Sequence, residues 1–197
     1  MFQTPVRRTG HRAVVAIGAV MILCVAHSDK SGADDLSDRP AQQANWSSAS
    51  KASPIYGITI PAGYRDWKLI SVSRLDGRLS QLRAQFGNDI AVKAMKDGTV
   101  PFPDGSIIAA VHWNNEAAGA NDEVLVLLGS NSFVPGAPVN VQFMVKDSKK
   151  YASTGGWGFA DFKDGKPGDE VLHNTCFACH QPAIAHDYVF THYAPAP

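Results

Sequence analysis

The chain contains a series of short segments in which apolar and polar positions alternate. Residues 66–73 (DWKLISVS) alternate Trp67 and Leu69 with polar neighbours and then add β-branched residues, and residues 82–86 (LRAQF) are apolar at every second position. A period of two residues is typical of half-buried strands. Four further runs have the composition of strands: residues 106–113 (SIIAAVHW), 123–129 (EVLVLLG), 139–145 (VNVQFMV) and 155–162 (GGWGFADF). The pattern therefore predicts a domain dominated by strands.

Helix signals are few and lie at two places. Asn88 has the character of an N-cap for a short helix over residues 89–96, which ends at Gly98. Residues 101–105 (PFPDG) form a turn by composition. A second helix is predicted from residue 169 up to the cysteine at residue 176. Strands separated by turns, without regular crossover helices, favour an antiparallel sheet, so the fold class is α+β with a mainly antiparallel sheet and a few helices.

The N-terminus predicts an export signal. Three arginines within the first twelve residues precede an apolar run over residues 13–26. Such a run rises only about 21 Å as a helix, whereas a hydrocarbon core is about 30 Å thick. We therefore expect residues 1–27 to be an export signal and the protein to be periplasmic. An uncleaved anchor is the alternative, and Cys24 within the run is interpreted as a signal hydrophobe rather than a lipid acceptor.

The composition changes after the signal. Residues 28–53 are rich in Ser, Ala and Asp with a single aromatic residue, which predicts a flexible leader. Residues 54–197 then form one domain of about 140 residues, enough for one core. The 18 basic residues balance the 18 acidic ones without a block of like charge, so no nucleic-acid partner is indicated.

The candidate chemistry lies close to the C-terminus. Cys176, Cys179 and His180 form a C-x-x-C-H motif. Two cysteines on one helical turn can each form a thioether with a haem vinyl group, and the histidine that follows them can bind the iron. The motif therefore predicts one covalently attached haem c with Cys176 and Cys179 as attachment points and His180 as the iron ligand.

Three other interpretations of the cysteine pair are less favoured. A redox-active pair needs a low-pKa thiol in a thioredoxin-like context, and the predicted context is a sheet followed by a terminal helix. A zinc site needs further ligands, and the sequence has no second C-x-x-C. A disulfide between residues three apart closes too small a loop to add much stability.

The segment after the motif indicates that the iron has one open face. Seventeen residues follow His180 and none is Met. Six residues span at most about 20 Å, so His186 would need a nearly straight path to the opposite face of the haem. The other candidates considered for a sixth ligand are two methionines and three histidines: Met95, Met144, His112, His173 and His192. We therefore expect five-coordinate iron that binds nitric oxide or a similar small ligand.

Aromatic residues are expected to form the walls around the haem, and an apolar wall favours a neutral diatomic ligand. The candidates lie in predicted strands or adjoining turns: Phe102, Trp113, Phe143, Trp157 and Phe159.

The chain resembles the cytochrome P-460 family, which includes the cytochromes c′-β. The resemblance covers nearly the whole domain and rests on four segments: residues 63–72 (GYRDWKLISV), 102–105 (FPDG), 141–159 (VQFMVKDSKKYASTGGWGF) and 176–193, with CFACH and DYVFTHY. It implies a mainly antiparallel β fold with a C-terminal haem-attachment helix, one c-type haem and frequent homodimerisation. It also implies that Cys176 and Cys179 carry the thioethers and that His180 is the proximal ligand.

One departure from the family bears on function. Members that oxidise hydroxylamine carry a lysine after the PDG turn that is cross-linked to the haem. Here the corresponding place is Ala110, and no lysine lies between Lys96 and Lys146. The chain therefore resembles the uncross-linked, gas-binding members. The alternatives are a nitrogen-oxide or hydroxylamine oxidoreductase, with Glu116 or Asp122 as a general acid, and a six-coordinate electron-transfer cytochrome with a redox partner protein.

Overall fold

The structure is a computed structural model that describes residues 51–117 and 133–194. The chain divides into two units, Met1–Ala41 and Gln42–Pro197, and every described residue belongs to the second. The predicted export signal, most of the predicted leader and the predicted strand at residues 123–129 lie outside the described residues. Within the described ranges, no helix has both the length and the apolar character that crossing a membrane requires.

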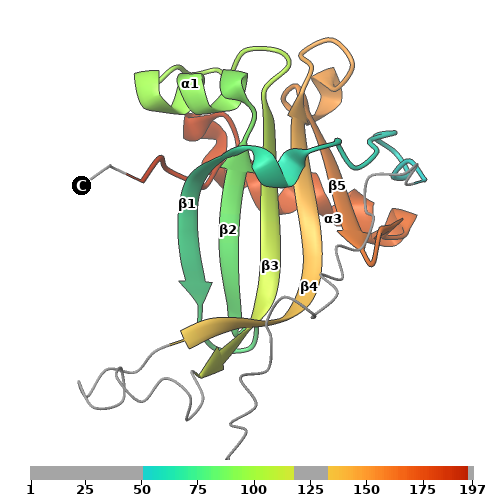
Figure 1. Cartoon of the computed structure of the whole chain (residues 1–197). Coiled ribbons are helices and arrows are strands. Elements are labelled where there is room, and N and C mark those ends of the chain that lie inside the picture. Colours follow the sequence, from blue (N-terminus) through green and yellow to red (C-terminus); the bar gives the residue numbers. More distant parts are fainter. Residues whose placement is uncertain (1–50, 118–132, 195–197) are drawn as a thin grey trace, which may run out of the picture. The chain divides into compact units, whose positions relative to one another are not determined.

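The described strands form one antiparallel sheet in which each strand pairs with its neighbours in sequence (Figure 1). Their bounds are β1 (Lys68–Leu75), β2 (Gln81–Gly87), β3 (Ile107–Ala117), β4 (Phe133–Lys146), β5 (Trp157–Lys163) and β6 (Lys166–Pro167). The prediction of an α+β fold with a mainly antiparallel sheet is confirmed. β1 begins two residues later than predicted because Tyr64–Asp66 form a 3-10 turn, η2, before it.

Two α-helices and two further short 3-10 segments complete the described part. They are α1 (Asp89–Asp97), η3 (Ala152–Thr154), α3 (Glu170–His180) and η4 (Gln181–His186). The predicted cap of α1 is confirmed, because the Asn88 side chain accepts a hydrogen bond from the Ala91 amide at 3.0 Å and Gly98 ends the helix with a φ of 65°. At the start of α3 the Asp169 carboxylate accepts from the Leu172 amide at 2.8 Å.

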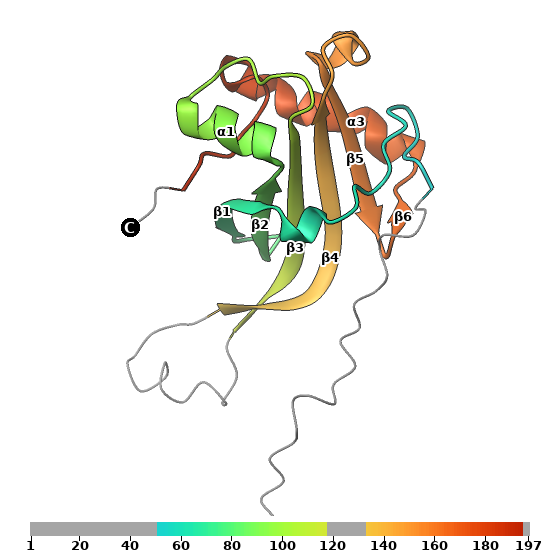
Figure 2. The ribbon, with the colours of Figure 1, turned by 45° about the horizontal axis from the view of Figure 1, so that its top comes forward.

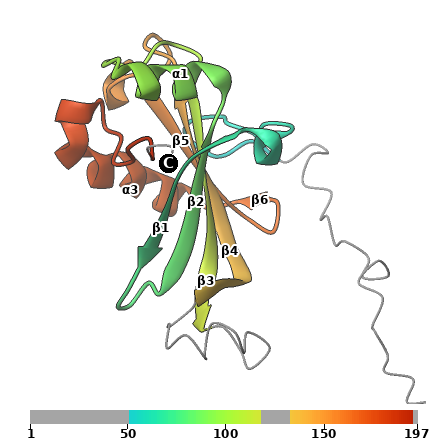
Figure 3. The same cartoon turned by 60° about the vertical axis from the view of Figure 1, so that its left-hand side comes forward.

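The sheet has different partners on its two faces. Figures 2 and 3 show α1, α3 and the C-terminal segment on one side of the sheet, and the segment that contains η2 on the other. On the η2 side, the Phe143 ring lies 5.2 Å from Tyr64 and 6.0 Å from Phe162 between centroids. On the opposite side, which we call the α3 face, Phe159 lies 4.9 Å from the His180 ring. The predicted haem-attachment motif therefore belongs to the α3 face.

Candidate functional site

The last turn and a half of α3 carries the three residues of the predicted haem site. Cys176 and His180 are four residues apart, so they lie on the same side of the helix, and both are half-buried. Cys179 is exposed, and both cysteines are free thiols. The structure therefore brings all three predicted residues together on one helix, with its inner side packed on β5.

His180 is held in one tautomer. Its Nδ1 lies 2.8 Å from the backbone oxygen of Tyr188. A carbonyl oxygen only accepts, so Nδ1 carries the hydrogen, and Nε2 of the neutral ring keeps its lone pair. Burial lowers the pKa of His180, and the hydrogen bond to Tyr188 opposes that shift in part. The Phe159 and Phe190 rings, 4.9 and 5.2 Å away, restrict the imidazole further. His180 thus presents a neutral, oriented nitrogen of the kind that metals bind.

The cysteine pair fits haem attachment better than the other interpretations. Burial, with smaller contributions from Asp161 and Cys179, raises the pKa of Cys176 to about 11. A redox-active thiol needs the opposite shift. Residues 51–117 and 133–194 contain no group of three or more His, Cys, Asp or Glu side chains that could hold a metal ion, so they do not supply the ligand set of a zinc site. The residues present fit a haem c bound through Cys176, Cys179 and His180.

Polar side chains line the α3 face in two rows that cross neighbouring strands. Residues directly opposite each other in an antiparallel pair project to the same face. The pairing therefore places Gln142 beside Asp161 on the face of Phe159, with Ala110 and then Gln85 next to it in the same row. Two residues further along each strand, on the same face, Arg83, His112 and Asn140 form a second row. We call these residues the polar rows.

Four buried polar atoms of the polar rows have no hydrogen-bond partner in the described part of the chain: Arg83 Nε, Gln85 Oε1, His112 Nε2 and Asn140 Oδ1. The amide groups of Asn140 and Gln142 do have a partner, because they donate to the Asp161 carboxylate at 2.6 and 2.8 Å. Buried polar atoms in proteins are nearly always paired. The four atoms therefore make this part of the α3 face a candidate place for a polar ligand or a cofactor substituent, although a side-chain hydrogen bond between His112 and Asn140, which raises the pKa of His112, pairs two of these residues with each other.

The aromatic residues predicted to surround the haem lie on both faces of the sheet. Phe159 and Trp157 do lie on the α3 face, but Phe143 faces η2 and cannot line the haem site. Sequence reasoning missed the polar residues, although a signal was present. Arg83 and Gln85, and likewise Asn140 and Gln142, are polar residues two apart in strands, which places each pair on one face.

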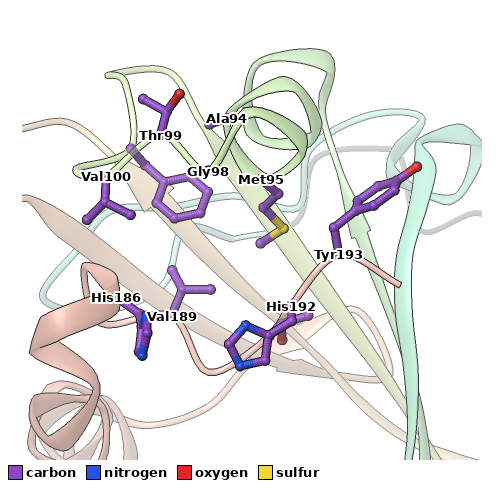
Figure 4. Close-up of a pocket in the computed structure, with 11 residues that line it drawn as sticks. Ala94, Met95, Gly98, Thr99, Val100, His186, Val189, His192 and Tyr193 are labelled. Atoms are coloured by element: carbon purple, nitrogen blue, oxygen red, sulfur yellow. The ribbon is translucent and has the colours of Figure 1, made fainter. Parts of the chain in front are cut away.

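The other histidines differ in whether their ring nitrogens are free to bind iron. His173 is fully buried, with Nδ1 donating to the Asp169 oxygen at 2.7 Å and Nε2 accepting from the Asp161 amide at 3.2 Å, so neither nitrogen is left for iron. His186 and His192 are exposed, with ring centroids 5.7 Å apart. Together with Met95 they line a pocket of about 220 Å³ between α1 and the C-terminal segment (Figure 4), and the three C-x-x-C-H residues are not part of its lining.

His112 and Met144 are the two remaining candidates for a sixth ligand, and both lie on the α3 face. Met144 is half-buried and is the cross-strand neighbour of Phe159. His112 is 2% exposed and lies between Arg83 and Asn140 in the polar rows.

His112 predicts a pH dependence of stability. Burial lowers its pKa from 6.5 to about 4; the Arg83 charge adds to this shift, and Asn140 opposes it. Between these two pH values the unfolded chain binds a proton at His112 that the folded chain does not. The contribution of neutral His112 to the free energy of unfolding is therefore fully present above pH 6.5 and is lost as the pH falls toward 4. We expect a loss on the order of 3 kcal/mol from this group. Urea unfolding across this pH range, compared with His112→Gln, measures it, and equal pH dependence of the two proteins would contradict it.

Comparison with protein-family models identifies a family that the chain is similar to. A family model described as cytochrome P460 matches residues 61–191, about two thirds of the chain. No curated protein matches the chain. The matched range contains the described sheet together with α3, so it covers both the polar rows and the helix with the C-x-x-C-H motif.

Proposed function

The chain belongs to the cytochrome P460 family and is a haem-binding cytochrome with haem c and iron, and from this premise we propose that it binds nitric oxide or a similar small ligand at five-coordinate iron. In this proposal Cys176 and Cys179 hold the haem by thioethers and His180 is the proximal ligand. The protein is exported to the periplasm and forms a homodimer. Its partners are a small gaseous ligand or a redox partner protein.

The observation that carries the proposal is the hydrogen bond of His180. Because Nδ1 donates to Tyr188, only Nε2 is available, and it belongs to a ring between two aromatic side chains. When bound, haem iron supplies a site for small ligands, and the chain supplies the proximal nitrogen and the groups near the open face. Neither nitrogen of His173 is free, and His186 and His192 line a pocket whose lining includes none of the three C-x-x-C-H residues.

Ala110 supports the ligand-binding assignment over hydroxylamine oxidation. It lies in the polar rows between Gln85 and Gln142, and its methyl group cannot form the nitrogen bridge of the cross-linked members. The carboxylate that stands nearby on the same face is Asp161, whereas Glu116 is exposed at the far end of β3 and Asp122 lies outside the described residues. The proposed general acid Glu116 is therefore poorly placed beside the polar rows.

Spectra of the purified protein test the proposal. We expect a high-spin ferric signal at neutral pH and a new nitrosyl spectrum when nitric oxide is added to the ferrous form. A low-spin ferric spectrum that nitric oxide does not change would overturn it. A red-shifted, broadened ferrous Soret band would instead indicate a modified haem and favour the oxidoreductase.

A six-coordinate electron-transfer cytochrome is the second candidate, and His112 is the observation that favours it. His112 is buried on the α3 face with Nε2 unpaired, and the lowered pKa keeps the ring in the neutral form that can bind iron. Substitution His112→Ala separates the two candidates. With five-coordinate iron the variant stays high-spin, as the unchanged protein is. If His112 is the sixth ligand, the unchanged protein is low-spin and His112→Ala becomes high-spin.

A further inference from the structure

A buried ion pair joins the end of β4 to the segment that follows the haem-attachment helix. Lys146 Nζ lies 2.8 Å from both carboxylate oxygens of Asp187, and the two side chains are 5% and 7% exposed. Asp187 also accepts a hydrogen bond from the Phe102 amide at 2.8 Å, and Lys146 donates to the Gly155 oxygen at 3.1 Å. Both charged groups are therefore held by several partners from three parts of the chain.

The pair fixes an unusual stretch of backbone. Asp187 and Tyr188 both have left-handed conformations, with φ of 51° and 66°. Residues other than Gly adopt this region at a cost of about 1 kcal/mol or more each, so the surrounding contacts must hold them there. Tyr188 is the residue whose carbonyl oxygen accepts from His180 Nδ1. The direction of that carbonyl thus depends on a turn that Asp187 anchors.

Burial of the pair calls for an explanation beyond stability. A buried ion pair contributes little net stability, because desolvation of both charges offsets their attraction. Lys146 is also fixed within the sheet, since it ends β4 opposite Trp157 and its ammonium lies 5.1 Å from the Trp157 ring centroid. The sheet can therefore serve as a rigid reference for the position of the Tyr188 carbonyl.

We propose that Lys146 and Asp187 are positioning residues for the proximal imidazole: their ion pair fixes the turn at Asp187 and Tyr188, and this turn holds the Tyr188 carbonyl that accepts the hydrogen bond from His180 Nδ1. The proposal rests on the assignment of His180 as iron ligand. A hydrogen bond from Nδ1–H makes the imidazole a stronger donor, and a stronger donor stabilises ferric iron. Loss of the anchor therefore weakens the ligand and raises the reduction potential.

Two single variants separate positioning from a simple effect of charge. Asp187→Asn removes a negative charge, and Lys146→Met removes a positive one. If the pair acts through charge alone, Asp187→Asn raises the potential and Lys146→Met lowers it or leaves it unchanged. If the pair positions the Tyr188 carbonyl, both variants raise the potential. The double variant Lys146→Met/Asp187→Asn keeps the net charge and is also expected to raise it.

The experiment measures the reduction potential and the iron–imidazole stretching band in the ferrous resonance Raman spectrum. We expect a higher potential and a lower stretching frequency in both single variants and in the double variant. Lys68 and Asp89 form a matched exposed pair at 2.7 Å, and Lys68→Met and Asp89→Asn are expected to leave both quantities unchanged. The double variant decides the question if either single variant fails to fold.

Opposite shifts of the two single variants, or an unchanged frequency in all three, would overturn the positioning role. The proposed function fails differently. Absence of the iron–imidazole band from the protein without substitutions would contradict five-coordinate ligation. The directions of the two shifts in reduction potential would then still decide whether Lys146 and Asp187 act by position or by charge.

Discussion

Replacing both Cys176 and Cys179 by serine is expected to yield a chain without covalently bound haem. A serine hydroxyl does not add to a haem vinyl group under the conditions in which a thiol does, so both attachment points are lost. Cys176 and Cys179 are the cysteines within the described residues, and both are free thiols on α3. The mass of the denatured chain, produced with the haem-attachment machinery, shows one haem in the unchanged protein and none in the double variant.

Three further variants give this experiment its controls. Each single cysteine variant retains one thioether and is expected to hold the haem less completely. Ala178→Ser changes an exposed residue between the two cysteines and is expected to keep full attachment. His180→Ala is expected to keep the haem attached but to lose normal iron ligation. Haem that remains bound to the denatured double variant would show that another residue forms the attachment.

The predictions that held depend on short stretches of sequence. The cap at Asn88, the stop at Gly98 and the start of α3 at Asp169 each involve side chains and amides within a few residues of each other. In the C-x-x-C-H motif, too, the helix alone brings Cys176 and His180 to one side, whereas the role of the motif in haem attachment stays a prediction. Such features can be predicted without knowledge of the tertiary fold.

The first half of β4 could not be predicted in the same way. β4 begins at Phe133 although Pro135, Gly136 and Pro138 all disfavour strand interiors. It forms because the far end of β3 pairs with it across irregular register shifts next to Trp113. The pairing is between distant parts of the chain, and tertiary contacts here override the local preference.

Two parts of the candidate site depend on the same kind of long-range information. The polar rows exist only because the register places His112 between Arg83 and Asn140, and the sequence does not give that register. The partner of His180 is a backbone carbonyl at Tyr188, which any residue type could supply. This carbonyl is positioned by left-handed backbone at Asp187 and Tyr188, neither of which is Gly, so the residue types do not predict the turn.

Substitution His173→Leu is expected to cause the largest loss of stability among the histidine variants. His173 is fully buried, and its two ring nitrogens join the start of α3 at Asp169 to the backbone of β5 at Asp161. Leucine has a similar volume but leaves the Asp161 amide without its partner, whereas the Asp169 carbonyl still accepts from the backbone amide of residue 173. A buried group that loses its hydrogen bond costs about 1–3 kcal/mol, so we expect a loss of about 2–3 kcal/mol.

Urea unfolding of the haem-bound protein measures this loss, with His186→Leu as the matched control. His186 is exposed in η4 and close to the same helix, so its substitution should change the free energy of unfolding by less than about 0.5 kcal/mol. The visible spectrum of folded His173→Leu should match that of the unchanged protein, because neither ring nitrogen is available for iron. Altered iron ligation in this variant would contradict the statement that neither ring nitrogen of His173 is available for iron. A free energy of unfolding equal to that of the control would mean that His173 does not serve as the link between α3 and β5.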